Sequence, residues 1–145
     1  MKYLLLKLVA GGLLAACKTA TVPAPPALGS IQPFELVKQK ATTVPANGGS
    51  VSLTLTEVQD SRCPSGMQCI WAGYAAVAVQ VTDATGSPQT ARITLLNNYL
   101  PTYARDSVSI VLNQKTYWLR LLEVSPYPGT GSGQPTTAKL RLRPA

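Results

Sequence analysis

Residues 51–56 (VSLTLT) decide the fold class, because apolar and small polar side chains alternate along them without interruption. Successive side chains of a β-strand point to opposite faces of the sheet, so this pattern predicts a strand with one buried face. Other segments repeat the alternation, with β-branched and aromatic residues at the apolar positions. The six further expected strands are residues 34–39, 76–81, 90–95, 107–112, 117–122 and 139–143.

Turn-forming residues separate these strands, for example Asn47-Gly48-Gly49 and Asn113-Gln114, and no segment has the pattern of a long amphipathic helix. We therefore expect an all-β domain over residues 34–145. About seven short strands with such spacing favour a single antiparallel β-sandwich, immunoglobulin-like or of a related Greek-key type. A small β-barrel is the alternative.

The first sixteen residues have the pattern of a secretory signal peptide. Lys2 and Lys7 form a basic head, an apolar run follows, and small residues precede Cys17. The run is shorter than the ~20 residues that span a bilayer. Leu14-Ala15-Ala16-Cys17 resembles the lipobox of bacterial lipoproteins, which implies that Cys17 becomes the acylated mature N-terminus. The alternative is ordinary cleavage beside an incidental cysteine.

Residues 17–33 predict a spacer between the lipidated Cys17 and the domain. Four prolines follow Lys18 within this segment, and proline-rich linkers favour the extended polyproline II conformation. Removal of residues 1–16 lowers the net charge from +7 to +5. We expect an exported protein anchored to the bacterial membrane by lipid. Because an aspartate after the cysteine favours the inner membrane in enterobacteria, Lys18 indicates the outer membrane if the host has two membranes.

The composition excludes several kinds of active site. The chain has no histidine, so it cannot form a Ser-His-Asp triad, a Cys-His pair or an imidazole metal site. Six carboxylates leave little choice for a paired-carboxylate enzyme. Asp60, Asp83 and Asp106 all lie in expected loops, where aspartate is an ordinary turn residue. We expect no catalytic activity, no cofactor and no metal.

Residues 60–73 (DSRCPSGMQCIWAG) contain the sharpest motif of the chain. In an exported domain Cys63 and Cys69 are expected to form a disulfide, with Pro64 helping the chain to turn back. A soft-metal site that uses both thiolates and Met67 is the alternative. We expect Asp60 to accept backbone N–H bonds, Arg62 to pair with a carboxylate, and Trp71 to pack beside the disulfide at the start of a strand, while Gly73 closes the motif.

The same motif resembles the D-S-R-C-P-x(4)-C-[IV]-W-A-G signature of a group of secreted or lipid-anchored bacterial proteins. Residues 117–128 (YWLRLLEVSPYP) are similar to the second recurring block of that group, Y-x-L-x-L-x-x-V-x-P-Y-P. The resemblance runs in the same order from the first expected strand to the last. It implies a small exported β-domain with one disulfide, and it implies no established activity.

Three features suggest binding. Lys139, Arg141 and Arg143 share one face of the last expected strand, and Arg120 joins them if that strand pairs with residues 117–124. This stripe suits anionic glycans, lipid head groups or an acidic protein; the alternative is that the cations only protect an edge strand from aggregation.

The second feature is the cysteine loop, which could present Met67 to a protease as an inhibitor does. The third is aromatic surface for stacking on sugars. Of Tyr99, Tyr103, Tyr117, Trp118 and Tyr127, we expect Tyr127 to be the best placed, because it lies in a loop rich in proline and glycine.

The expected function is that of a lipid-anchored, non-catalytic binding or structural module at the surface of the cell envelope. Its expected partners are the membrane, through the anchor, and an envelope protein or anionic glycan. Nucleic acid is not expected, because the compartment is wrong and no aromatic residues are interleaved with the cations. We expect a monomer.

Mass spectrometry of the mature N-terminus tests the anchor. We expect a chain that begins at Cys17 and carries a diacylglyceryl thioether and an amide-linked acyl chain, because two or more chains are needed for stable anchoring. An unmodified Cys17, or cleavage at another bond, would contradict the prediction.

Overall fold

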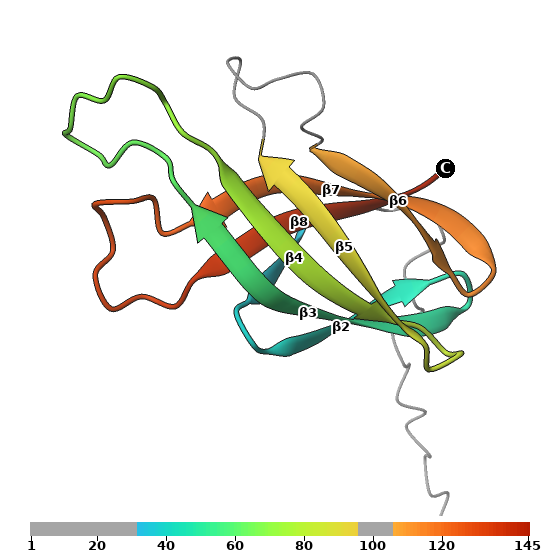
Figure 1. Cartoon of the computed structure of the whole chain (residues 1–145). Coiled ribbons are helices and arrows are strands. Elements are labelled where there is room, and N and C mark those ends of the chain that lie inside the picture. Colours follow the sequence, from blue (N-terminus) through green and yellow to red (C-terminus); the bar gives the residue numbers. More distant parts are fainter. Residues whose placement is uncertain (1–31, 96–105) are drawn as a thin grey trace, which may run out of the picture.

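Two four-stranded antiparallel sheets pack face to face in the structure, a computed structural model that describes residues 32–95 and 106–145 (Figure 1). The strands are β1 (Phe34–Val37), β2 (Ala41–Ala46), β3 (Gly49–Asp60), β4 (Ala75–Thr82), β5 (Pro88–Leu95), β6 (Ser107–Leu112), β7 (Lys115–Ser125) and β8 (Thr137–Pro144). The expected antiparallel sandwich is confirmed. The small-barrel alternative is wrong, because the sheets do not close on one another. The signal peptide, Cys17 and most of the spacer lie outside the described residues, as do Tyr99 and Tyr103.

The two sheets have the strand orders β1-β8-β7-β6 and β2-β3-β4-β5. The second sheet is a meander of four consecutive strands. The sheet β1-β8-β7-β6 has an order related to the Greek key. Its three consecutive strands β6, β7 and β8 lie next to β1, which is remote from them in sequence. This arrangement differs from the immunoglobulin fold, whose two sheets contain strands A, B, E, D and strands C, F, G, because neither of those sheets is a meander of four consecutive strands.

The core is formed by the apolar side of each alternating strand. Leu53 and Leu55 of β3, Val79 of β4, Leu119 of β7 and Leu140 of β8 are completely buried. Burying each such side chain stabilises the fold by roughly 1.5–3 kcal/mol. The alternation in the sequence therefore predicted which face of each strand meets the opposite sheet.

Two β-bulges change which residues face the core. The ladder of β3 with β4 shifts between Leu55 and Glu57, and that of β7 with β8 shifts between Leu121 and Glu123. An extra residue reverses the parity of the alternation, so Val124 is buried while Glu123 is exposed. The Thr56 hydroxyl donates to the Ala78 carbonyl oxygen at 3.0 Å across the first bulge.

The structure corrects two expectations about strands. There are eight strands in the described residues rather than seven, because Ala41–Ala46 pairs with β3 as β2. Pro45 lies within this strand, and β2 is an edge strand, where a missing N–H is tolerated. Second, β8 lies inside its sheet, between β1 and β7, so its cations do not protect an edge.

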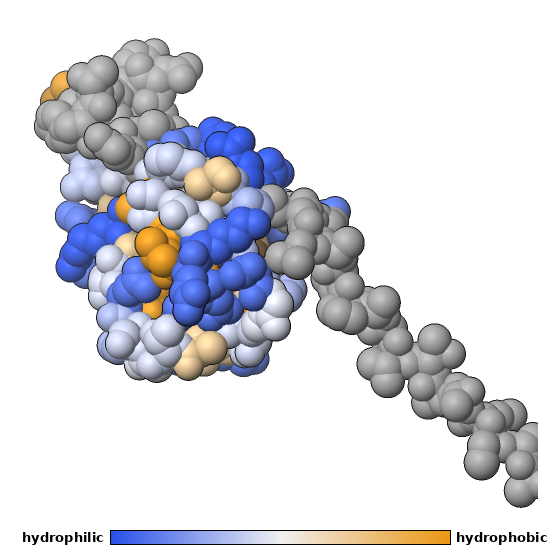
Figure 2. All heavy atoms as spheres, turned by 90° about the vertical axis from the view of Figure 1, so that its right-hand side faces the viewer, coloured by the Kyte–Doolittle hydropathy of each residue, from blue (hydrophilic) through white to orange (hydrophobic). Residues whose placement is uncertain are grey.

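Three turns meet at one end of the sandwich, which we call the hairpin end: those around Asn47, Asp83 and Asn113. The Asn113 side-chain amide donates to the Ala46 carbonyl oxygen at 2.8 Å and accepts from the Ala84 N–H at 3.2 Å. The Asp83 carboxylate accepts from the Asn113 N–H at 3.0 Å. These bonds tie the β2–β3, β4–β5 and β6–β7 connections together. Figure 2 views the side at the right of Figure 1, where hydrophilic side chains surround a small apolar area.

Replacement of Asp83 by Asn should make the stability of the domain less dependent on acid pH. Hydrogen bonds from the Thr85 hydroxyl and from the Asn113 and Thr85 N–H groups hold the pKa of Asp83 below its ordinary value of 3.8. A lowered pKa in the folded state contributes stability that is present above the unfolded value and is lost as pH falls through the folded one.

Urea unfolding of both proteins at pH 7 and at about pH 2–3 measures this effect. We expect D83N to be the less stable protein at pH 7 and the difference to shrink in acid. A difference that stays constant between the two pH values would contradict the prediction.

Candidate functional site

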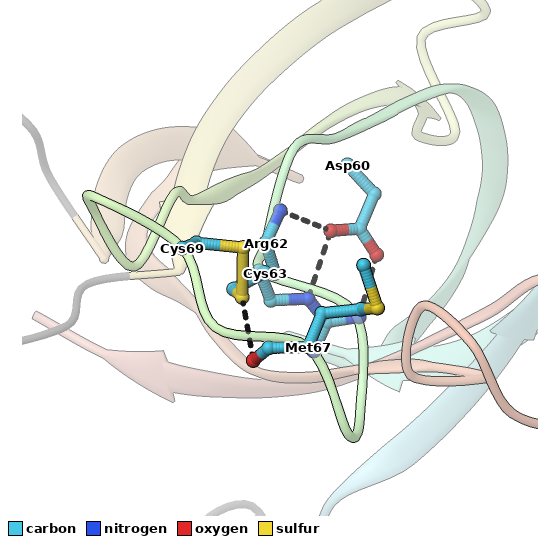
Figure 3. Close-up of a disulfide and its surroundings, with 5 residues drawn as sticks. All are labelled: Asp60, Arg62, Cys63, Met67 and Cys69. Atoms are coloured by element: carbon cyan, nitrogen blue, oxygen red, sulfur yellow. Dashed lines mark hydrogen bonds and ion pairs between the residues drawn. A yellow bond between two sulfur atoms is a disulfide. The ribbon is translucent and has the colours of Figure 1, made fainter.

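Within the described residues, two loops form the end of the sandwich opposite the hairpin end: residues 61–74 and 126–136. We call this end the loop end (Figure 1). Asp60, the last residue of β3, begins the first of the two loops. Its carboxylate accepts from the Arg62 backbone N–H at 3.1 Å and from Nε and Nη2 of the same guanidinium at 2.9 and 2.6 Å. The expected roles of Asp60 and Arg62 are thus both observed, in one mutual pair (Figure 3).

Arg62 also joins the two sheets. Its Nη2 donates to the Val124 carbonyl oxygen of β7 at 2.8 Å, and its guanidinium carbon lies 4.4 Å from the centre of the Tyr127 ring. The side chains of Arg62 and Asp60 are only 10 % and 19 % exposed, so screening by solvent is weak here. Tyr127 therefore has one ring face occupied by Arg62, which leaves less of it for a sugar than we expected.

Cys63 and Cys69 form the predicted disulfide, with Cα atoms 5.9 Å apart. The soft-metal alternative needs both thiolates, and the disulfide uses both sulfur atoms. Cys63 Sγ lies 3.4 Å from the Met67 carbonyl oxygen, a contact without a hydrogen-bonding proton because the sulfur is oxidised (Figure 3). The Ser65 N–H donates to the Pro128 carbonyl oxygen at 2.8 Å, so the disulfide loop rests on the second loop.

Inside the disulfide the chain makes a tight turn. The Met67 N–H donates to the Pro64 carbonyl oxygen at 3.1 Å, as in a β-turn that begins at the proline. Gly66 has a φ of +79°, which suits glycine. Pro64 thus has its expected role in turning the chain.

Gly73 is required by a close approach of backbone. Its φ is +68°, and a Cβ at this position would lie 1.8 Å from the Ser61 carbonyl oxygen. The two sides of the loop approach there through paired backbone bonds, Ser61 N–H to the Tyr74 carbonyl oxygen at 2.9 Å and Cys63 N–H to that of Ala72 at 3.0 Å. No other residue type fits without moving this backbone.

Three large apolar side chains of the first loop face solvent, and we call them the apolar tip: Met67, Ile70 and Trp71. Their exposed fractions are 67 %, 107 % and 61 %. Trp71 was expected to pack beside the disulfide at the start of a strand, but β4 begins only at Ala75 and most of the Trp71 side chain faces solvent. Its ring forms an edge contact with the Tyr74 ring, with centroids 6.2 Å apart. Ile70 was not among the predicted site residues, because no neighbouring residue marks it as exposed.

The expected basic stripe lies on the outer face of the sheet β1-β8-β7-β6, and we call it the basic face: Trp118, Arg120, Lys139, Arg141 and Arg143. Arg120 stands opposite Arg141, and Trp118 stands opposite Arg143, in the ladder between β7 and β8. All four cations are exposed. The stripe is therefore real, although it crosses the middle of a sheet rather than its edge.

The charges of the basic face are only partly neutralised. Arg120 forms an ion pair of 2.7 Å with Asp106, and Lys139 stands between Glu35 and Glu123 in the strand register. Arg141 and Arg143 form no ion pair within residues 32–95 and 106–145. These two arginines are the most available positive charges of the face.

The remaining candidates do not come together. Asp60 is paired with Arg62 at the loop end, Asp83 belongs to the hairpin end, and Asp106 is paired with Arg120. Tyr117, considered as an aromatic platform, is 4 % exposed and belongs to the core. The candidate sites are thus two: the basic face and the apolar tip.

Comparison with protein-family models, with curated proteins and with solved structures found no match. In the described part of the chain there is no helix of the length and apolar character needed to cross a membrane.

A pair of glycine variants tests the packing of the loop end. Gly73→Ala should destabilise the domain by about 1–3 kcal/mol more than Gly66→Ala, because both have positive φ but only Gly73 meets backbone. Gly66 is the matched control, since a Cβ there meets nothing within 4 Å. Urea unfolding gives both values. Equal losses would show that the Ser61 backbone moves aside freely.

Proposed function

We propose that this protein is a lipid-anchored, non-catalytic binding module of the cell envelope, and that its basic face binds an anionic glycan. The observation that carries the proposal is the placement of Arg141 and Arg143 on a central strand, exposed and without carboxylate partners in the described residues. Cys17 supplies the anchor, and residues 17–33 hold the domain away from the lipid surface.

The arrangement of the cations costs stability that a purely structural face would avoid. Like charges directly opposite in an antiparallel ladder are destabilising, and Arg120 stands opposite Arg141. Asp106 relieves part of this repulsion through Arg120. A polyanion on the face would relieve the rest, which supports binding as the reason for the arrangement.

Trp118 favours a glycan over other polyanions. It is 37 % exposed and occupies the row that also contains Ser109 and Arg143. An indole beside a guanidinium offers an apolar platform for a sugar ring and a charged donor for a carboxylate, sulfate or phosphate on it. The row of Ser107, Arg120 and Arg141 lies two positions along, on the same face.

Protease inhibition through the disulfide loop is the second candidate, and the exposure of Met67 favours it. A protease cleft takes a substrate-like segment in extended form, as in strand addition. Residues 64–67 form a tight turn instead, closed by the bond between Met67 and Pro64. The loop geometry therefore supports inhibition less well than the basic face supports polyanion binding.

Charge substitution on the basic face tests the proposal. The double variant R141Q/R143Q should bind heparin, used as a probe polyanion, at least about tenfold more weakly than the wild type at low salt, since exposed charges act strongly there. The matched control is K38Q/K40Q, which removes the same charge from exposed lysines between β1 and β2. Titration calorimetry gives both affinities.

A Trp118→Ala variant separates glycan recognition from simple attraction. It should weaken binding to heparin while leaving binding to inorganic polyphosphate nearly unchanged.

Equal losses of heparin affinity in R141Q/R143Q and K38Q/K40Q, or undiminished binding by R141Q/R143Q, would overturn the proposal.

A further inference from the structure

The loop end has a character opposite to that of the basic face. Residues 63–74 and 126–136 contain no charged residue, although the chain as a whole carries a net charge of +7. Asp60 and Arg62, which come just before residue 63, neutralise one another in their ion pair. The apolar tip thus projects from a surface of uncharged residues.

We propose that the apolar tip inserts into the interface of a lipid bilayer and so forms a second membrane contact of the domain. The inference rests on the proposed function for its location, because the lipid on Cys17 places a bilayer beside the domain. The insertion is shallow and consists of the side chains of Met67, Ile70 and Trp71.

The shape of the tip favours a bilayer over a protein surface. The loop of residues 61–74 projects beyond the ends of β3 and β4 (Figure 1). A protein interface of standard size covers about 800 Å² on each partner, which is more than the three side chains of the apolar tip can cover, because even an aromatic side chain buries only about 150–250 Å². A bilayer makes no such demand, since each apolar side chain contributes by its own buried area.

The residue types of the tip suit the membrane interface. Tryptophan is enriched at the level of the lipid head groups, and isoleucine and methionine transfer readily to hydrocarbon. Tyr74 touches Trp71 through its ring edge, and Tyr127 lies on Arg62 in the neighbouring loop, so two further amphipathic rings lie below the tip. Residues 63–74 and 126–136 carry no charge, which removes the largest cost of insertion.

The loop is held in shape before it meets lipid. The disulfide, the turn bond from Met67 to Pro64 and the bond from Ser65 to Pro128 fix its backbone. These bonds also satisfy the N–H groups of Ser65 and Met67 without water. Little conformational entropy is therefore lost on insertion.

The tip and the anchor can reach one bilayer. Phe34, where β1 begins, stands opposite Leu140, three positions from the loop-end start of β8. The distance along the strand from Phe34 to the loop end is therefore about 10 Å. The loop of residues 61–74 adds at most about 25 Å to the distance between Phe34 and the apolar tip. Residues 17–33 can extend up to about 60 Å, which exceeds this distance.

Tryptophan fluorescence tests the inference directly. The protein used is the chain from residue 17 with Cys17→Ser and Trp118→Phe, which keeps every described strand and leaves Trp71 as the only tryptophan. On neutral phosphatidylcholine vesicles we expect the emission of Trp71 to shift to the blue and to be quenched by brominated lipid. Met67→Ser with Ile70→Ser in the same protein should lower the partition coefficient at least tenfold.

The matched control is Val111→Ser, which removes an exposed apolar residue from the sheet face and should leave partitioning within twofold. An unshifted Trp71 emission on vesicles would overturn the inference. It would also be overturned if partitioning required anionic lipid and disappeared in R141Q/R143Q, because binding would then belong to the basic face. Phosphatidylcholine vesicles carry no net negative charge, so this experiment can fail while the glycan proposal stands, and the reverse holds for heparin.

Discussion

The ion pair of Arg62 with Asp60 is the interaction on which the loop end depends. A sandwich holds its two sheets together mainly by apolar burial, which is strong but has no direction, so it leaves the ends of the layers free to slide. Arg62 supplies direction: it takes its carboxylate from the end of one sheet and its carbonyl acceptor, Val124, from the other. Removal of the guanidinium would leave a largely enclosed carboxylate with the Arg62 backbone N–H as its remaining donor, and the Ser65–Pro128 bond would then have to hold the second loop against the first.

At the hairpin end, too, polar side chains rather than apolar burial fix how the connections are aligned. Asn113 and Asp83 connect three turns through hydrogen bonds to the backbone of Ala46, Ala84 and Asn113. The core between the two ends contains no buried polar or charged residue within the described chain. Apolar burial therefore sets the stability of the sandwich, and a few hydrogen-bonding side chains at its ends set the alignment of its layers.

Alternation in the sequence predicted the strands and their buried faces, because it depends only on the geometry of an extended backbone. It did not predict neighbours. The alternation of Leu140 and Leu142 does not show whether β8 lies at an edge or inside its sheet. The position of β8 matters, because the arginines of an edge strand could serve only to prevent aggregation, whereas those of an inner strand need another explanation. β2 was not among the expected strands, and its sequence contains Pro45; the pairing of the whole sheet shows that it lies at an edge, where proline is tolerated. Trp71 was expected to pack beside the disulfide on its hydrophobicity, whereas the tight loop leaves most of its side chain in solvent.

The disulfide has a consequence for the biogenesis of the protein. It joins residues six positions apart within one loop, and no strand of the described fold depends on it for its partner. The pairing of the two layers therefore does not require the disulfide to form first. In the exported protein that we propose, oxidation could fix the projecting loop after the sandwich has assembled, and the exposed isoleucine and tryptophan would then take their final positions only in an oxidising compartment.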